Sequence, residues 1–177
     1  NHELKLYGNA QVNNLILPSI LINEDLITKM KNQFPFIESD FFDFLHDEIA
    51  KYATKISMPG PTGESNSIRY KPKGTALCLG PTAIDALKQT LLALLLGNSV
   101  VSLIKEDEYN SLITLGFGKE NIYRLVNGPS LKLMKSESYK VILFFGNLMS
   151  VEKLIVYQRS AITPVMSSLY ETWQLVN

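Results

Sequence analysis

The sequence predicts an α/β fold: an open, mostly parallel, Rossmann-like sheet preceded by a helical arm. Short apolar runs at 74–79, 99–104, 121–126 and 139–145 alternate with helical segments. Most of these runs are apolar at consecutive positions, which is typical of strands buried on both faces of a parallel sheet. Alternation of strands and helices further implies right-handed crossovers between parallel neighbours.

Composition indicates a packed protein without an obvious polyanion partner. Hydrophobic residues make up 46% of the 177 residues, and 17 Lys+Arg balance 17 Asp+Glu. The densest basic cluster is RYKPK (69–73), so no nucleic-acid binding is expected from this chain. A single cysteine, Cys78, excludes an internal disulfide and favours a cytoplasmic location. The longest apolar run, 91–96, is too short to span a membrane, so any membrane association would come through a larger parent protein.

The first part of the chain predicts two helices and a linker. One helix begins near Asn23 and ends before Pro35; the second covers 39–55 and carries an apolar, partly aromatic stripe. Prolines and glycines then mark a linker at 58–66, with a short edge strand at 67–70. The expected divisions are a helical arm (1–58), a Pro/Gly linker with an edge strand (59–73) and a Rossmann-like domain (74–177).

The second part of the chain predicts alternating helices and strands. A helix capped by Thr82 ends at Gly97, and its inward-facing residues are expected to be Ile84, Leu87, Leu91, Leu94 and Leu95. Further helices are expected at 106–115 and 150–159, and a last strand at 162–167. Residues 170–176 alternate like the start of a hairpin, which suggests a fragment of a longer protein.

The residues themselves offer no catalytic, metal or dinucleotide site. The turn LGPT (79–82) has one glycine, and Pro81 removes a donor, so the glycine-rich phosphate loop is absent. Cys78 lies inside an apolar strand, where a buried, inert thiol is expected. His2 and His46 have no second metal-type ligand at helical spacing other than neighbours such as Asp43 and Glu48, so no zinc site is expected. A solvated helix start explains the acids at 106–108.

Three stretches resemble the nucleotide-binding domain of aldehyde dehydrogenases. ALLLGNSVV (93–101) is similar to the family's A-L-A-x-G-N-x-V-V, ENIYRLVNG (120–128) to its following strand, and ILFFGNLMSVEKLI (142–155) to its F-T-G-S-x-x-x-G-x-x-I turn. The resemblance covers residues 74–167 and implies the aldehyde dehydrogenase fold.

The departures from this family fall on its ligand-binding positions. The Lys and Glu that reach the adenosine ribose correspond to the stretch LIKE (103–106), in which only Glu106 remains. Asn147 and Val151 replace the Ser and second Gly of the phosphate-facing turn, and residues 166–169 lack the family's Glu. The catalytic G-Q-x-C segment has no match. The resemblance therefore implies a copy of the scaffold that does not bind the cofactor.

The linker narrows the resemblance. PGPTGESN (59–66), followed by a short strand and an apolar run, resembles the C-terminal region of long bacterial proline utilization A proteins. These join an FAD-dependent proline dehydrogenase to an NAD-dependent L-glutamate γ-semialdehyde dehydrogenase. Their extra aldehyde-dehydrogenase-like domain is non-catalytic, supports the dehydrogenase and helps to close the substrate channel. The resemblance implies other domains of the same polypeptide as partners, with expected contacts at 59–66 and around Trp173.

Two alternatives remain open. The chain could be the NAD-binding domain of an active aldehyde dehydrogenase, with Thr82 at the phosphate and Glu106 at the ribose. It could also be a stand-alone small-molecule-binding protein that uses the strand ends.

Overall fold

The centre of the fold is a five-stranded parallel sheet with strand order β5-β4-β3-β6-β7. The structure is a computed structural model that describes residues 24–126, 141–143 and 165–166. The strands are β3 (Thr75–Cys78), β4 (Ser99–Ser102), β5 (Ile122–Arg124), β6 (Val141–Leu143) and β7 (Val165–Met166). Every neighbouring pair in this sheet is parallel, and Leu77 lies opposite Val101 on one side and Ile142 on the other. The predicted α/β class and parallel sheet are confirmed.

Helix α4 (Ala83–Leu95) makes the crossover from β3 to β4 and is buried on nearly all sides. The Thr82 side chain caps its first turn, as predicted, by accepting a hydrogen bond from the Asp85 backbone. At its other end the Gly97 and Asn98 amides donate to the Leu94 and Ala93 carbonyls, with Gly97 at φ +79. This is the Schellman pattern, in which glycine avoids the steric cost of a left-handed backbone.

One predicted core position of α4 is wrong. Ile84 is 41% exposed, whereas the other four predicted inward residues are buried. Ile84 lies in the first turn of α4, where Ala83 is exposed as well, and the buried positions begin at Ala86.

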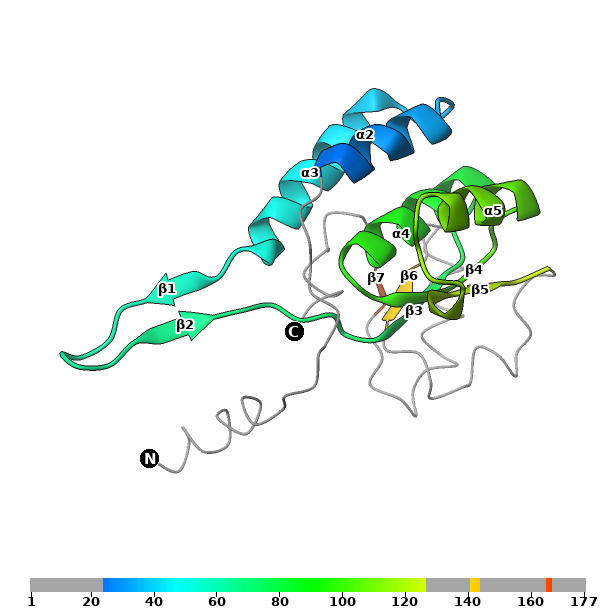
Figure 1. Cartoon of the computed structure of the whole chain (residues 1–177). Coiled ribbons are helices and arrows are strands. Elements are labelled where there is room, and N and C mark those ends of the chain that lie inside the picture. The colour runs from blue at the N-terminus through cyan, green and yellow to red at the C-terminus, as the bar shows by residue number, and fades with distance from the viewer. Residues whose placement is uncertain (1–23, 127–140, 144–164, 167–177) are drawn as a thin grey trace, which may run out of the picture.

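Helix α5 (Glu106–Thr114) follows β4 and is succeeded by the short 3-10 helix η2 (Lys119–Asn121). Figure 1 shows α4 and α5 over the same face of the sheet, as expected when successive crossovers move in one direction. The first turn of α5 is not wholly solvated as predicted. Glu108 is only 5% exposed, because its carboxylate turns back to accept a hydrogen bond from the Lys105 backbone at 2.7 Å.

Helices α2 (Glu24–Gln33) and α3 (Ser39–Ala53) form an antiparallel pair that packs beside α4 and α5. Gln33 donates a hydrogen bond to Ser111 of α5 at 2.9 Å, and Glu38 pairs with Lys88 of α4 at 2.5 Å. One continuous apolar cluster includes side chains of the helical pair and of the sheet layer, among them Met30, Phe42, Leu45, Ala76, Leu91 and Val100. The arm and the sheet therefore share a core.

The segment predicted as a linker forms the turn of a β-hairpin. Strand β1 (Ile56–Met58), which the sequence did not predict, pairs antiparallel with β2 (Asn66–Ile68). Figure 1 shows this hairpin projecting from the end of α3, away from the parallel sheet. The predicted edge strand at 67–70 thus belongs to a separate two-stranded sheet.

Several expectations fall outside the described residues: the helix at 150–159, the hairpin arm at 170–176, Asn147, Val151 and Trp173. The described part of the chain contains no helix with both the length and the apolar character needed to cross a membrane.

Candidate functional site

The candidate site lies at the carboxyl edge of the sheet, around the end of β3. From β3 the chain proceeds outward to β4 and β5 on one side, and β6 and β7 flank it on the other. Ligands of open α/β sheets bind at such a reversal of strand order. Residues 79–82 leave β3 here, and residues 103–106 leave the neighbouring strand β4 at the same edge.

The turn after β3 is packed closely against α4. Gly80 has φ +51, and a Cβ built there would lie 2.4 Å from the Ala86 nitrogen and 2.5 Å from the Thr82 carbonyl oxygen. The Gly80 amide donates to Gln89 Oε1 at 2.9 Å. The one glycine amide that could approach a phosphate is therefore already bound to a buried side chain, and Pro81 has no amide hydrogen to offer.

The Thr82 side chain caps the N-terminus of α4. Its hydroxyl accepts a hydrogen bond from the Asp85 amide at 3.2 Å and donates to Asp85 Oδ2 at 2.6 Å. The Asp85 carboxylate thus brings a negative charge to the helix N-terminus. Such a charge interacts favourably with the helix dipole but repels an incoming anion.

Glu106, the second candidate residue, begins α5 after β4. Its carboxylate pairs with Arg124 of β5 at 3.3 Å and is 76% exposed. Thr82 and Glu106 therefore lie at one edge of the sheet, but each is bound to its own neighbour. Glu106 would have to exchange the Arg124 guanidinium for a ribose hydroxyl in order to bind a nucleotide.

Sequence reasoning missed a row of buried polar groups beneath this edge. Thr90 and Ser102 share a hydrogen bond of 2.6 Å between α4 and β4, and the Thr90 hydroxyl also donates to the Ala86 carbonyl. Gln89 is completely buried, and its Nε2 has no partner within the described residues. The sequence feature that could have indicated this row is the polar pair Gln89-Thr90 directly before the apolar run 91–96.

Cys78 lies next to this row, with its thiol buried. The thiol is fully buried, and this burial raises its pKa from 9.0 to about 12, although the Thr90 hydroxyl acts in the opposite direction. Only the thiolate is an effective nucleophile. The predicted burial of the thiol is confirmed, and its inertness stays a prediction.

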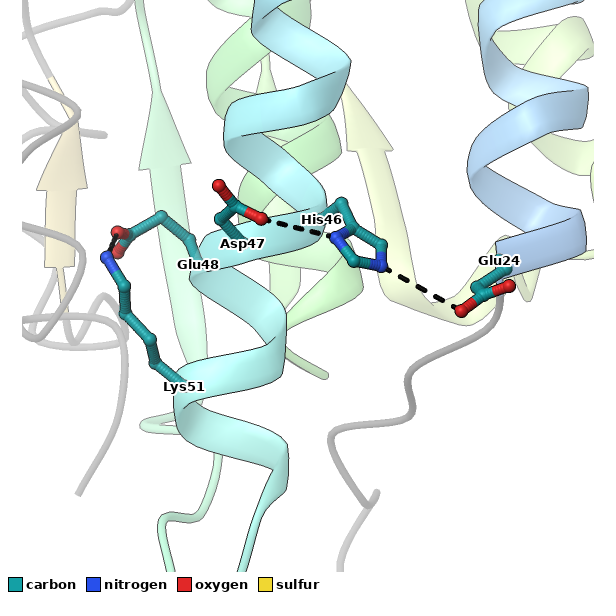
Figure 2. A network of polar contacts seen from close by, with 5 residues as sticks. All are labelled: Glu24, His46, Asp47, Glu48 and Lys51. Atoms are coloured by element: carbon teal, nitrogen blue, oxygen red, sulfur yellow. Dashed lines mark hydrogen bonds and ion pairs between the residues drawn. The ribbon is translucent and has the colours of Figure 1, made fainter.

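His46 is held by carboxylates on the helical pair, far from the strand ends in the sequence. Figure 2 shows its ring between Asp47, at 3.3 Å from Nδ1, and Glu24, at 4.0 Å from Nε2, while Lys51 pairs with Glu48 beside it. Among residues 24–126, 141–143 and 165–166, no group of three or more His, Cys, Asp or Glu side chains is arranged to hold a metal ion. His2 lies outside the described residues.

Comparison with solved structures identifies the fold. The chain is similar to a mutant of proline utilization A from Bradyrhizobium japonicum, with TM-score 0.61 and 22% identity over 71% of this chain. It is also similar to an aldehyde dehydrogenase from Mycobacterium tuberculosis complexed with NAD+, with TM-score 0.61 and 11% identity over 76% of this chain. A betaine aldehyde dehydrogenase mutant from Staphylococcus aureus, also in complex with NAD+, gives TM-score 0.54 and 14% identity over 71% of this chain. The structural neighbours are thus proline utilization A proteins and aldehyde dehydrogenases, whose fold this chain shares.

The chain spans only a fraction of these proteins: 15% of the Bradyrhizobium chain, 31% of the Mycobacterium chain and 30% of the Staphylococcus chain. No protein-family model matches the sequence. No curated protein matches it either.

Proposed function

We propose that the chain is a non-catalytic structural domain of a bifunctional bacterial enzyme that converts proline to glutamate. In this role it supports a neighbouring L-glutamate γ-semialdehyde dehydrogenase domain and helps to close the channel between two active sites. The parent is a cytoplasmic protein whose other domains use FAD and NAD, and the partners of this domain belong to the same polypeptide. The similarity to proline utilization A in fold supports this proposal.

The observation that carries the proposal is the closed turn at Gly80. An aldehyde dehydrogenase scaffold is retained, but the Gly80 amide is bound to Gln89, and the Thr82 hydroxyl is bound to Asp85. Glu106, the one residue retained from the ribose-binding pair, is bound to Arg124. A dinucleotide would have to break each of these contacts before it gained any of its own.

Calorimetric titration of the chain with NAD tests this proposal. We expect no saturable heat at millimolar NAD, while a catalytically competent aldehyde dehydrogenase, titrated in parallel, binds. Micromolar affinity that falls when Glu106 is changed to Gln would contradict the proposal. A matched substitution on the same helix, Asp107→Asn, controls for a general change of charge, since Asp107 is also exposed in the first turn.

The second candidate function is the NAD-binding domain of an active aldehyde dehydrogenase. One observation favours it: Thr82 and Glu106 lie at the same edge of a sheet whose fold is shared with NAD-bound relatives. The same titration separates the two functions, because this candidate requires saturable binding that depends on Glu106.

A further inference from the structure

We propose that helix α4 closes the carboxyl edge of the sheet from within, because its side chains Gln89 and Asp85 occupy the hydrogen-bond donors of the turn at 79–82. Removal of both side chains should open this turn to a phosphate-type anion. The inference rests on the proposed function, since it names the contacts that keep the domain free of a dinucleotide. The juxtaposition that carries it is two donors of the turn against two acceptor oxygens of one helix.

The two acceptors lie one helical turn apart. Asp85 and Gln89 share a face of α4, because residues four positions apart in a helix are neighbours. Gln89 Oε1 accepts a hydrogen bond from the Gly80 amide at 2.9 Å, and Asp85 Oδ2 accepts one from the Thr82 hydroxyl at 2.6 Å. A phosphate group binds by presenting its oxygens to donors of these two kinds. The chain therefore supplies, from its own helix, the acceptors that such a ligand would bring.

Packing alone does not account for a glutamine at position 89. The Gln89 side chain is completely buried, where an apolar side chain of similar size would fill the same volume. Its Oε1 is bound to Gly80, but its Nε2 has no partner within the described residues. A buried donor without an acceptor destabilises a fold. The contribution that a methionine could not make at this position is the acceptor for the Gly80 amide.

The Gly80 amide depends on this acceptor. Gly80 is buried, and its backbone bends at φ +51 where the chain turns into α4. Without Gln89 Oε1 a buried N–H would lose its partner, so the turn would have to move until water or a ligand oxygen reached it. Pro81 and Thr82 follow directly and are exposed, so solvent lies only one residue further along the chain.

Asp85 contributes charge as well as an acceptor. The first amides of α4 carry the partial positive charge of a helix N-terminus, which favours an anion. The Asp85 carboxylate lies beside them and repels an anion at short range. Removal of Gln89 alone should therefore give weaker anion binding than removal of both side chains.

NMR spectroscopy of the full chain tests the inference, with inorganic pyrophosphate as the probe. Gln89→Met removes the acceptor with little change in volume, and Gln89→Met combined with Asp85→Ala removes the carboxylate as well. We expect the Gly80 amide hydrogen to exchange with solvent about tenfold or more faster in Gln89→Met than in the native chain. Millimolar pyrophosphate should shift the Gly80 resonance saturably in the double variant, more weakly in Gln89→Met, and not in the native chain.

Thr90→Val is the matched control. Thr90 is as buried as its neighbour Gln89, and this change also removes a buried hydrogen bond, the one to Ser102, without touching the Gly80 amide. Exchange and pyrophosphate response at Gly80 should therefore match the native chain. Asp85→Ala alone changes a residue at the partly exposed start of α4 and keeps Gln89 in place. Its Gly80 resonance should not respond to pyrophosphate, whether or not Gln89→Met folds, and a response would overturn the role of Gln89.

The outcomes separate the inference from the proposed function. Saturable binding of pyrophosphate or NAD by the native chain would refute the proposed function and the inference with it. A folded Gln89→Met protein whose Gly80 amide exchanges at the native rate would overturn the inference alone. So would a folded double variant in which pyrophosphate leaves the Gly80 resonance unmoved. Thermal unfolding curves establish that each variant is folded.

Discussion

Replacement of Asn98 by Ala tests how strongly the Asn98 side chain links the segments that enter strands β3 and β4. Asn98 is 3% exposed, and its Oδ1 accepts hydrogen bonds from the Lys73 amide at 2.9 Å and the Gly74 amide at 3.0 Å. Its Nδ2 donates to the Ala93 carbonyl at 3.3 Å. One side chain thus connects the end of α4 to the segment that enters β3.

The expected loss follows from the two amides that the substitution leaves without an acceptor. An unsatisfied buried donor costs about 1–3 kcal/mol, and the lower half of that range applies because both bonds are only partly buried. The Asn98→Ala protein should therefore lose about 2–4 kcal/mol in free energy of unfolding. For a chain of this size, that loss lowers the melting temperature by roughly 5–15 °C.

Urea unfolding followed by circular dichroism measures the loss. Asn110→Ala is the matched control, because Asn110 is exposed on α5 and should change stability by less than about 0.5 kcal/mol. An Asn98→Ala protein as stable as the control refutes the reasoning.

Three further predictions concern the same layer. Gly80→Ala should be destabilised by about 1–3 kcal/mol in urea unfolding, because φ is +51 and the new Cβ meets the Ala86 nitrogen at 2.4 Å; unchanged stability would contradict the tight turn. Cys78 should not react with a thiol reagent at pH 8 until the chain is unfolded. Because burial raises its pKa from 9.0 to about 12, the folded state keeps the proton that the unfolded state releases, and stability should fall as pH rises above 9.0. The hydrogen bond from Lys88 lowers the pKa of Glu38, so the charged pair stabilises the folded chain at neutral pH. The native protein should therefore be more stable than Glu38→Gln at neutral pH, and this difference should vanish as the pH falls through the lowered pKa. A difference in stability that persists in acid contradicts this prediction.

The parallel sheet was predictable because its strands are buried on both faces, so that consecutive positions such as Val100 and Val101 must be apolar. The Thr82 cap was predictable because it depends only on residues three positions apart. These features are encoded within a few neighbouring residues.

The missed features depend on distant residues or on very short strands. The β1–β2 hairpin has three-residue strands with apolar side chains on one face only, and the prolines between them are equally typical of a linker. The bond from the Gly80 amide to Gln89 links a loop to the second turn of a helix, and no local sequence pattern indicates it. Only the folded structure shows this hydrogen bond, which is the contact that bears most directly on the candidate site.

The core shared by the helical pair and the sheet has a consequence for how the chain can be divided. Helix α4 is apolar on the side facing β3 and also on the side facing α3, where Lys88 lies 5.5 Å from the centre of the Phe41 ring. A protein started at residue 59 would expose apolar side chains of the shared cluster to water and would be prone to aggregation. The chain should accordingly melt in a single cooperative transition, with the helical pair and the sheet losing structure together. A fusion protein that includes the parallel sheet must therefore include α2 and α3 as well.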